Sequence, residues 1–314
     1  MSTTSKTTAR SYRVVNPATG EPGEEFPLAT DAEIQDALAA SQAAHESWRE
    51  VPIEERSRIV SRVAELFTER MDELAAIITE EMGKPLPESA GEAEYCTDIF
   101  NYFATEGPSL AADQEIKAIG GGRAVIQKLP VGPLLGIMPW NYPYYQVARF
   151  AAPNLMLGNT IILKHAESCP KSALAIQKIM DDAGVPAGVY QNVFASHDQI
   201  AERAGAIIGE LAGKNLKKVV LELGGSDPYV VLDAEDVKEA AANAWATRIE
   251  NTGQACNSNK RMIVSDGIFD EFVAELTNLA KDLKPGNPAE AAEGTYAPLS
   301  SRSAAEGLAE QIQD

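Results

Sequence analysis

Cysteine and histidine are both scarce in this chain of 314 residues, which contains three of each. The cysteines Cys96, Cys169 and Cys256 are odd in number and widely spaced, which suits neither a disulfide framework nor a zinc site. This usage is typical of a reducing compartment. The histidines are scattered without the spacing of metal ligands, so we expect no metal site.

Positive charge and long apolar runs are also lacking. Lysine and arginine number 27 against 46 aspartates and glutamates, a net charge of −19 that would repel nucleic acid and anionic membranes, so we expect neither as a partner. No apolar run is long enough to span a bilayer, and residues 1–13 contain no hydrophobic segment of the signal-peptide type. A cytoplasmic protein is therefore expected, with a length that allows two domains or one large α/β unit.

The first third of the chain is predicted to be mainly helical. A short strand over 11–16 and a turn over 17–20 precede a helix that opens with the capping box Thr30 and Glu33. Further helical patterns follow Pro52 and Met71 and cover about 87–103. Residues 115–129 predict a β-hairpin around three glycines, which we interpret as a turn because they do not fit G-x-G-x-x-G and no helix follows.

Strands and helices alternate in the middle of the chain, which predicts a parallel sheet with helices on its faces. The expected strands are 134–138, 160–163 and 189–194, and the expected helices are 145–157 and 170–183. Ligands bind at the carboxyl ends of such strands, where residues 139–143 and 164–167 lie. Beyond them we expect a helix over 198–212 with no strand inside it, strands 218–223, 229–232 and 261–264, helices 235–250 and 268–283, a loop 284–298 and a last helical stretch to 314.

Three polar positions in this framework are candidates for chemistry. Cys256 lies in the glycine-bearing loop NTGQACNSNKR, where a thiol is accessible to a substrate, although a buried inert cysteine is the alternative. Asn141 follows a strand between two prolines and either donates to an oxyanion or forms an Asx turn. Glu222 lies inside the apolar run VVLEL, where desolvation favours a general base and a structural carboxylate is the alternative.

Two further residues, Lys164 and Glu167, offer an ammonium and a carboxylate that suit the hydroxyls of a ribose, unless they form only a surface ion pair. A cysteine nucleophile, an amide donor and a desolvated glutamate together indicate acyl-type chemistry through a thiohemiacetal or thioester. Spacing alone takes the interpretation no further.

Four segments resemble, in order, the signatures of the NAD(P)-dependent aldehyde dehydrogenase superfamily. They are MPWNYP at 138–143, LKHAE at 163–167, LELGG at 221–225 and NTGQAC at 251–256, and the resemblance covers essentially the whole chain. Within the superfamily, YQVARF at 145–150, KHA at 164–166 and LGGSDP at 223–228 are most similar to the short succinate-semialdehyde dehydrogenases.

The resemblance implies a role for each candidate. Cys256 would attack the aldehyde, the Asn141 side chain and the Cys256 backbone N–H would hold the oxyanion, and Glu222 would activate water. Lys164 and Glu167 would meet the adenosine ribose. The remaining cofactor contacts would be Pro139 and Trp140, lining the cleft, and Leu223, close to the nicotinamide. Because a carboxylate at Glu167 would repel a 2′-phosphate, NAD is expected over NADP, with Lys164 able to tolerate the phosphate.

The implied fold is α/β, with a parallel-sheet cofactor domain, a β-hairpin oligomerisation arm and an incomplete α/β catalytic domain. The cofactor domain is expected over 1–114 and 131–223, the hairpin over 115–130 and the partial catalytic domain over 224–314. Two departures from the family pattern stand out. A strand and a helix-opening Gly-Ser that receives the pyrophosphate are missing near residues 202 and 203, and the chain ends before the rest of the catalytic domain.

Three hypotheses follow. The first is an NAD-dependent aldehyde dehydrogenase. The resemblance implies succinate semialdehyde as its substrate and a homo-oligomer as its assembly. The second is a truncated, catalytically impaired relic or subunit fragment that pairs with a complete paralogue through the hairpin. The third is a cofactor-free thiol hydrolase that uses Cys256 and Glu222 on activated esters. Because supporting parts of the site are missing, we expect weak turnover, poor stability and doubtful assembly.

Overall fold

The computed structural model describes residues 11–118, 121–196, 199, 213–214, 216–220, 225–281, 283–292 and 294–313. These residues form two compact units. The first contains residues 22–81 and 89–196 together with the N-terminal segment up to Val15, and the second contains 16–21, 82–88 and the chain from 197 onward. Among the described helices, none is long and apolar enough to cross a membrane.

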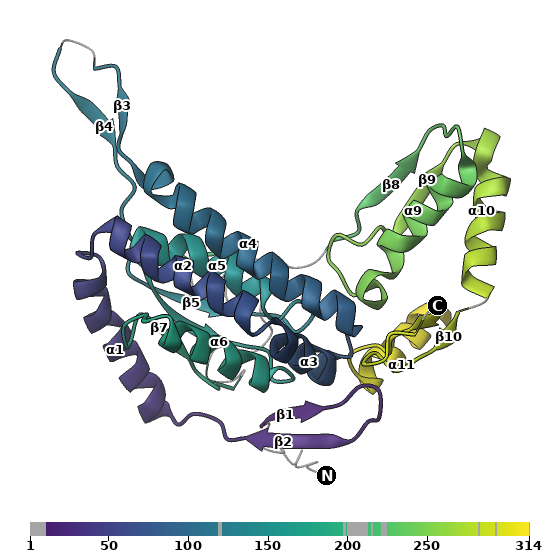
Figure 1. Ribbon diagram of the computed structural model, residues 1–314, viewed down its shortest axis with the longest axis horizontal. Helices are drawn as coiled ribbons and strands as arrows, with labels where there is room; N and C mark the ends of the chain where they lie inside the picture. Colours follow the sequence, from purple (N-terminus) through teal and green to yellow (C-terminus); the bar gives the residue numbers. More distant parts are fainter. Residues whose placement is uncertain are drawn as a thin grey trace. The chain divides into compact units, whose positions relative to one another are not determined.

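A three-stranded parallel sheet forms the centre of the first unit, in the order β5 (Pro133–Ile137), β6 (Thr160–Lys164), β7 (Tyr190–Asn192) (Figure 1). Every residue of β6 is buried, as expected of a central parallel strand. The connecting helices are α5 (Tyr145–Leu157) and α6 (Pro170–Asp182). Because both connections step in the same direction across the sheet, the right-handed rule for parallel strands places both helices on one face. The predicted parallel α/β fold is confirmed, and the strands end together at one edge of the sheet.

Four helices precede the sheet in sequence: α1 (Asp31–Trp48), α2 (Ile53–Glu69), α3 (Met71–Met82) and α4 (Leu86–Ala111). The predicted capping box of α1 is present, with the Thr30 side chain accepting from the Glu33 N–H and the Glu33 carboxylate accepting from the Thr30 N–H. The core between α2, α4 and the start of α5 contains Phe67, which stacks on Phe100 at 5.6 Å and meets the edge of Tyr144 at 6.0 Å.

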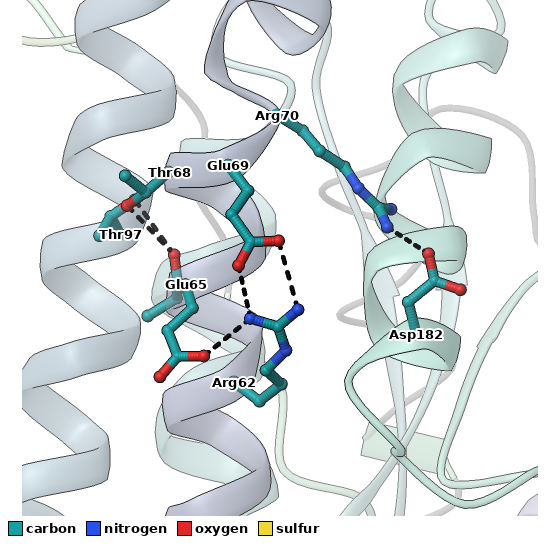
Figure 2. A network of polar contacts seen from close by, with 8 residues as sticks. Arg62, Glu65, Thr68, Glu69, Arg70, Thr97 and Asp182 are labelled. Atoms are coloured by element: carbon teal, nitrogen blue, oxygen red, sulfur yellow. Dashed lines mark hydrogen bonds and ion pairs between the residues drawn. The ribbon is translucent and has the colours of Figure 1, made fainter.

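Polar contacts cover the outer side of α2 (Figure 2). Arg62 binds Glu69 through two N–H groups and Glu65 through one, and Arg70, just beyond α2, binds Asp182 at the end of α6. Because the Arg62 cluster is largely exposed, solvent and salt screen it, and it contributes little to stability.

The predicted hairpin is present as β3 (Gln114–Ile116) and β4 (Ala124–Ile126), which pair antiparallel and project beyond the end of α4 (Figure 1). Helix α4 is longer than the predicted 87–103 and continues through Pro108. Tertiary packing explains the extension, because Gly107 lies so close to Met156 that a Cβ there would be 2.8 Å from the Met156 Cε. The predicted N-terminal strand is β1 (Tyr12–Val15), and it pairs with β2 (Pro22–Phe26), which we did not anticipate.

The second unit contains the parallel pair β8 (Pro228–Val231) and β9 (Arg261–Val264), with α9 (Val237–Ile249) and α10 (Asp266–Lys281) packed against it. Phe272, Val231, Ala241 and Ala244 form its buried core. A last helix, α11, covers Arg302–Gln313.

Two predictions for the second unit were wrong. The loop expected over 284–298 contains a short parallel pair, β10 (Lys284–Pro285) and β11 (Thr295–Tyr296). The strand expected over 218–223 is absent at 218–220, where the described chain forms no regular secondary structure and Val220 is 79% exposed. A strand forms only where a neighbouring strand accepts its backbone hydrogen bonds. Residues 221–223, the helix expected over 198–212 and the gap near 202 lie outside the described residues, apart from residue 199 in that helix.

Candidate active site

The turn that follows β5 carries the predicted amide donor. Pro139 is exposed, and Trp140 and Asn141 are half-buried within the first unit. The Pro143 carbonyl at the end of this turn accepts a hydrogen bond of 2.9 Å from Nε2 of His165, which follows β6. The His165 side chain therefore links this turn to the end of β6.

Glu92, on α4, holds the start of α5 just beyond this turn. Its Oε1 accepts from the N–H groups of Tyr144 at 2.9 Å and Tyr145 at 3.0 Å. These N–H groups have no partner within the helix because they lie in its first turn, and a carboxylate there also interacts favourably with the helix dipole. The glutamate was not predicted, because nothing in its local sequence reveals a contact with residues 52 and 53 positions away.

Lys164 lies at the end of β6, as predicted, but it is far more buried than a surface ion pair. The side chain is only 3% exposed, and its ammonium sits over the Tyr12 ring at 5.3 Å from the centroid. Burial lowers the pKa of Lys164, and the negative charge of Glu167 opposes this shift. The half-buried Glu167 accepts from the Arg13 N–H through its backbone carbonyl, at 3.1 Å.

Tyr12 is a further residue of this region that sequence reasoning missed. Its hydroxyl lies 3.1 Å from the carbonyl oxygen of His165 and 3.0 Å from that of Ala195. One phenolic hydrogen is thus shared between the loops that follow β6 and β7. Tyr12 is 153 positions from His165, so nothing in the local sequence indicates this contact.

A partly desolvated ammonium beside a carboxylate, at the carboxyl end of a parallel sheet, fits the sugar and phosphate groups of a dinucleotide. The ammonium donates to hydroxyl or phosphate oxygens, and the carboxylate accepts from hydroxyls. Lys164 and Glu167 therefore carry groups that could hold the ribose or phosphate of such a ligand.

Cys256 is exposed, whereas Cys96 and Cys169 are buried. It occupies a turn between the 3-10 helix η1 (Glu250–Gly253) and β9. The ammonium of Lys260 donates to the Cys256 carbonyl at 3.1 Å, to the Ala255 carbonyl at 3.0 Å and to the Gly225 carbonyl at 2.8 Å. The thiol is therefore accessible while the backbone that carries it is fixed.

The predicted base Glu222 and the predicted cofactor contact Leu223 lie outside the described residues. Gly225, three positions after Glu222, is described, and an added Cβ there would lie 3.8 Å from the Cys256 carbonyl oxygen. Lys260 binds both backbone carbonyls. Gly225 therefore lies beside the cysteine turn.

The backbone before the cysteine is unusual. Asn251 (φ 47°) and Thr252 (φ 54°) are left-handed, a conformation that is uncommon for asparagine and a marked outlier for β-branched threonine. Gly253 follows with φ 75°, and a Cβ there would lie 2.1 Å from Nη1 of Arg248. The surrounding structure must therefore hold this segment in place.

Asn141, Lys164 and Glu167 belong to the first unit and Cys256 to the second, so each part of the candidate site is described within its own unit.

Comparison with known proteins places these features in a family. The model of the aldehyde dehydrogenase family matches residues 3–314. A succinate-semialdehyde dehydrogenase [NADP(+)] of Deinococcus radiodurans is 47% identical over 97% of this chain and 67% of its own length, and one of Mycobacterium avium is 37% identical over 96% and 67%.

A solved succinic semialdehyde dehydrogenase from Streptococcus pyogenes, in complex with NADP+, has a TM-score of 0.92 at 37% identity and covers 96% of this chain and 70% of its own. The chain thus spans about two thirds of the length of these relatives. A family match over nearly every residue shows that this protein belongs to the aldehyde dehydrogenase family of oxidoreductases.

Proposed function

We propose that this chain oxidises succinate semialdehyde to the corresponding acid with NADP, using Cys256 as the nucleophile. The observation that carries the proposal is the accessible thiol on a fixed turn, beside Gly225. The relatives named above support the substrate and the cofactor.

In the proposed reaction the Cys256 thiolate attacks the aldehyde carbon. The Asn141 amide and the Cys256 backbone N–H stabilise the oxyanion of the resulting thiohemiacetal. The bound dinucleotide supplies the hydride acceptor. Glu222 then removes a proton from water, which hydrolyses the thioester and releases the acid. The thiol is regenerated, and no further oxidant is needed.

The preference for NAD expected from Glu167 is not what the relatives indicate, since their names specify NADP. We therefore propose NADP, with the desolvated Lys164 ammonium compensating for the Glu167 carboxylate beside the 2′-phosphate. Pro139 and Trp140 line the cofactor cleft in this proposal, and Leu223 lies close to the nicotinamide.

We assign the cofactor domain to 1–114 and 131–223, the oligomerisation hairpin to 115–130 and the partial catalytic domain to 224–314. Exposed apolar side chains of the hairpin support its role in assembly, since Ile116 is 46% and Ile126 48% exposed. A second copy of this chain or a complete paralogue are the two candidate partners, and co-purification with a longer dehydrogenase would identify the latter.

Purified protein incubated with succinate semialdehyde and either NADP or NAD tests the proposal through the formation of reduced nicotinamide. We expect turnover with NADP that Cys256→Ala abolishes. Folded protein that binds NADP but forms no product would refute the catalytic proposal and favour the impaired subunit. Ester turnover that depends on Cys256 but is unaffected by either dinucleotide would instead indicate a cofactor-free hydrolase.

A further inference from the structure

Glu88 lies in the first turn of α4 and belongs, with residues 82–88, to the same compact unit as the cysteine turn. Its Oε2 accepts a hydrogen bond of 2.8 Å from the backbone N–H of Asn251, 163 positions further along the chain. Asn251 is buried and is the first of the two left-handed residues that precede Cys256. The contact therefore joins a half-buried carboxylate to left-handed backbone just before the cysteine.

Charged groups of both signs lie near this contact. Burial raises the pKa of Glu88, the Asn251 N–H and the positive charge of Lys84 oppose this shift, and the negative charge of Glu250 adds to it. A carboxylate that accepts from a backbone N–H in a partly desolvated place forms a charge-assisted bond, which is stronger than a neutral one.

Glu88 is itself held in position. The N–H of Leu86, two residues earlier, donates to the Pro288 carbonyl at 2.9 Å, and this fixes the start of α4 against the segment after β10. That segment also leads to Ala297, whose carbonyl accepts from the Thr252 hydroxyl at 3.1 Å. Glu88 and Ala297 thus fasten two consecutive left-handed residues to the same part of the unit.

The rest of the turn follows from these anchors. The Gln254 side chain donates to the Asn251 carbonyl at 3.0 Å and accepts from the Ser300 N–H at 2.9 Å. Asn251, Thr252 and Gln254 therefore have fixed positions immediately before Cys256. Without the carboxylate, the Asn251 N–H would lose its charged acceptor, and the left-handed pair would lose one of the contacts that offset its strain.

We propose that Glu88 is the positioning residue of the nucleophile: by holding the Asn251 N–H it keeps the left-handed bend closed and sets the orientation of Cys256. This proposal rests on the proposed role of Cys256 in the reaction. Glu88 touches neither substrate nor cofactor and acts only through the loop.

Glu88→Ala and Glu88→Gln separate the hydrogen bond from the charge, because glutamine keeps an acceptor oxygen and alanine does not. Asp236→Ala is the matched control. Asp236 accepts from the N–H groups of Lys238 and Glu239 at the start of α9, so its loss also removes a carboxylate from backbone N–H groups of this unit, but far along the helix from the cysteine turn.

Two measurements on the full chain report on the loop without any need for turnover. The first is hydrogen exchange of the peptide containing Asn251, and the second is the rate at which iodoacetamide alkylates Cys256, identified by its absence in Cys256→Ala. In Glu88→Ala we expect roughly tenfold faster exchange or more, because a bond to a charged acceptor is lost. We also expect the alkylation rate to change by about threefold or more, because the thiol loses its fixed surroundings.

Glu88→Gln keeps a weaker, neutral acceptor and should give rates between those of wild type and Glu88→Ala, and Asp236→Ala should leave both unchanged despite lower stability. Unchanged exchange and alkylation in folded Glu88→Ala would overturn the proposal, as would equal changes in Asp236→Ala. If Glu88→Ala does not fold, an alkylation rate in folded Glu88→Gln equal to that of the urea-unfolded chain would overturn it too. A protein that shows the expected rates but no aldehyde oxidation would refute the proposed function and leave this inference standing.

Discussion

His165 and Pro143 join the ends of two neighbouring strands through one hydrogen bond whose direction is fixed. Nδ1 of His165 accepts from the Ala166 N–H at 2.8 Å, so the ring hydrogen is on Nε2, which donates to the Pro143 carbonyl at 2.9 Å. The imidazole is fully buried and neutral, and burial lowers its pKa to about 4. It connects the strand end that carries Lys164 to the turn that carries Asn141.

This arrangement predicts a loss of stability in acid. Between the ordinary pKa of 6.5 and the folded value of about 4, the unfolded chain binds a proton at His165 and the folded chain does not. The free energy of unfolding therefore falls as the pH drops through this window, by up to about 3 kcal/mol from this group. Urea unfolding of wild type and His165→Gln at several pH values measures this change in the free energy of unfolding. A difference between the two that does not change from pH 7 to pH 4 would contradict the prediction.

Glu81 should make the free energy of unfolding change with pH in the opposite direction. The side chain is 1% exposed and holds the start of α6, accepting from the Lys171 N–H at 2.6 Å, the Ser172 N–H at 3.0 Å and the Ser172 hydroxyl at 2.6 Å. These bonds favour the charged form, but burial outweighs them and raises the pKa to about 7.

The folded chain then retains a proton on Glu81 that the unfolded chain releases, so stability falls as the pH rises from about 4.5 to about 7. From this group the loss amounts to roughly 3 kcal/mol. Glu81→Gln should remove that slope and leave the acid-side loss from His165 in place. The half-buried Glu80 forms an ion pair with Lys171, so Glu80→Gln is the control and should keep the wild-type slope.

Local patterns were sufficient for much of the framework and insufficient for the contacts that hold the site. The bounds predicted for α5 and β9 agree with the structure, because a 3.6-residue period and a short β-branched run depend on neighbouring residues alone. Cys256 was found from the small polar residues around it. Glu88 and Tyr12 were missed, because each contacts residues more than 150 positions away and the neighbouring sequence does not indicate the contact.

The strand predicted over 218–223 also shows that local sequence does not determine long-range contacts. Its apolar residues have the right composition, yet 218–220 form no ladder with any residue that the structure describes. Composition states a preference for the extended backbone, and pairing decides whether a strand forms.

Replacing Gly253 should lower the free energy of unfolding for two reasons, which a matched pair of variants can separate. Gly294, in the same unit, also has a positive φ (72°), but nothing lies within 4 Å of an added Cβ. Gly294→Ala should therefore cost only the left-handed strain, about 1–2 kcal/mol. Gly253→Ala must in addition displace Arg248, whose guanidinium donates to the Ser258 hydroxyl at 3.0 Å, and we expect at least about 1 kcal/mol more.

Urea unfolding of the two variants checks the difference in the free energy of unfolding, and alkylation of Cys256 checks whether the turn itself has moved. We expect Gly253→Ala to alter the alkylation rate and Gly294→Ala to preserve it. Equal costs for the two substitutions would mean that Arg248 moves aside freely and does not stabilise the turn.

The choice between the two dinucleotides depends on the opposing charges of Lys164 and Glu167. If Lys164 compensates for the carboxylate beside the 2′-phosphate, Lys164→Met should weaken NADP by about tenfold or more while changing NAD much less. Glu167→Gln removes the repulsion and should tighten NADP relative to NAD. Equilibrium titration of both dinucleotides against each variant gives these ratios without requiring turnover. Because both effects are electrostatic, added salt should reduce them. If the NADP to NAD ratio were the same in wild type and both variants, the 2′-phosphate could not be bound beside this pair, and the cofactor preference would have to come from other residues.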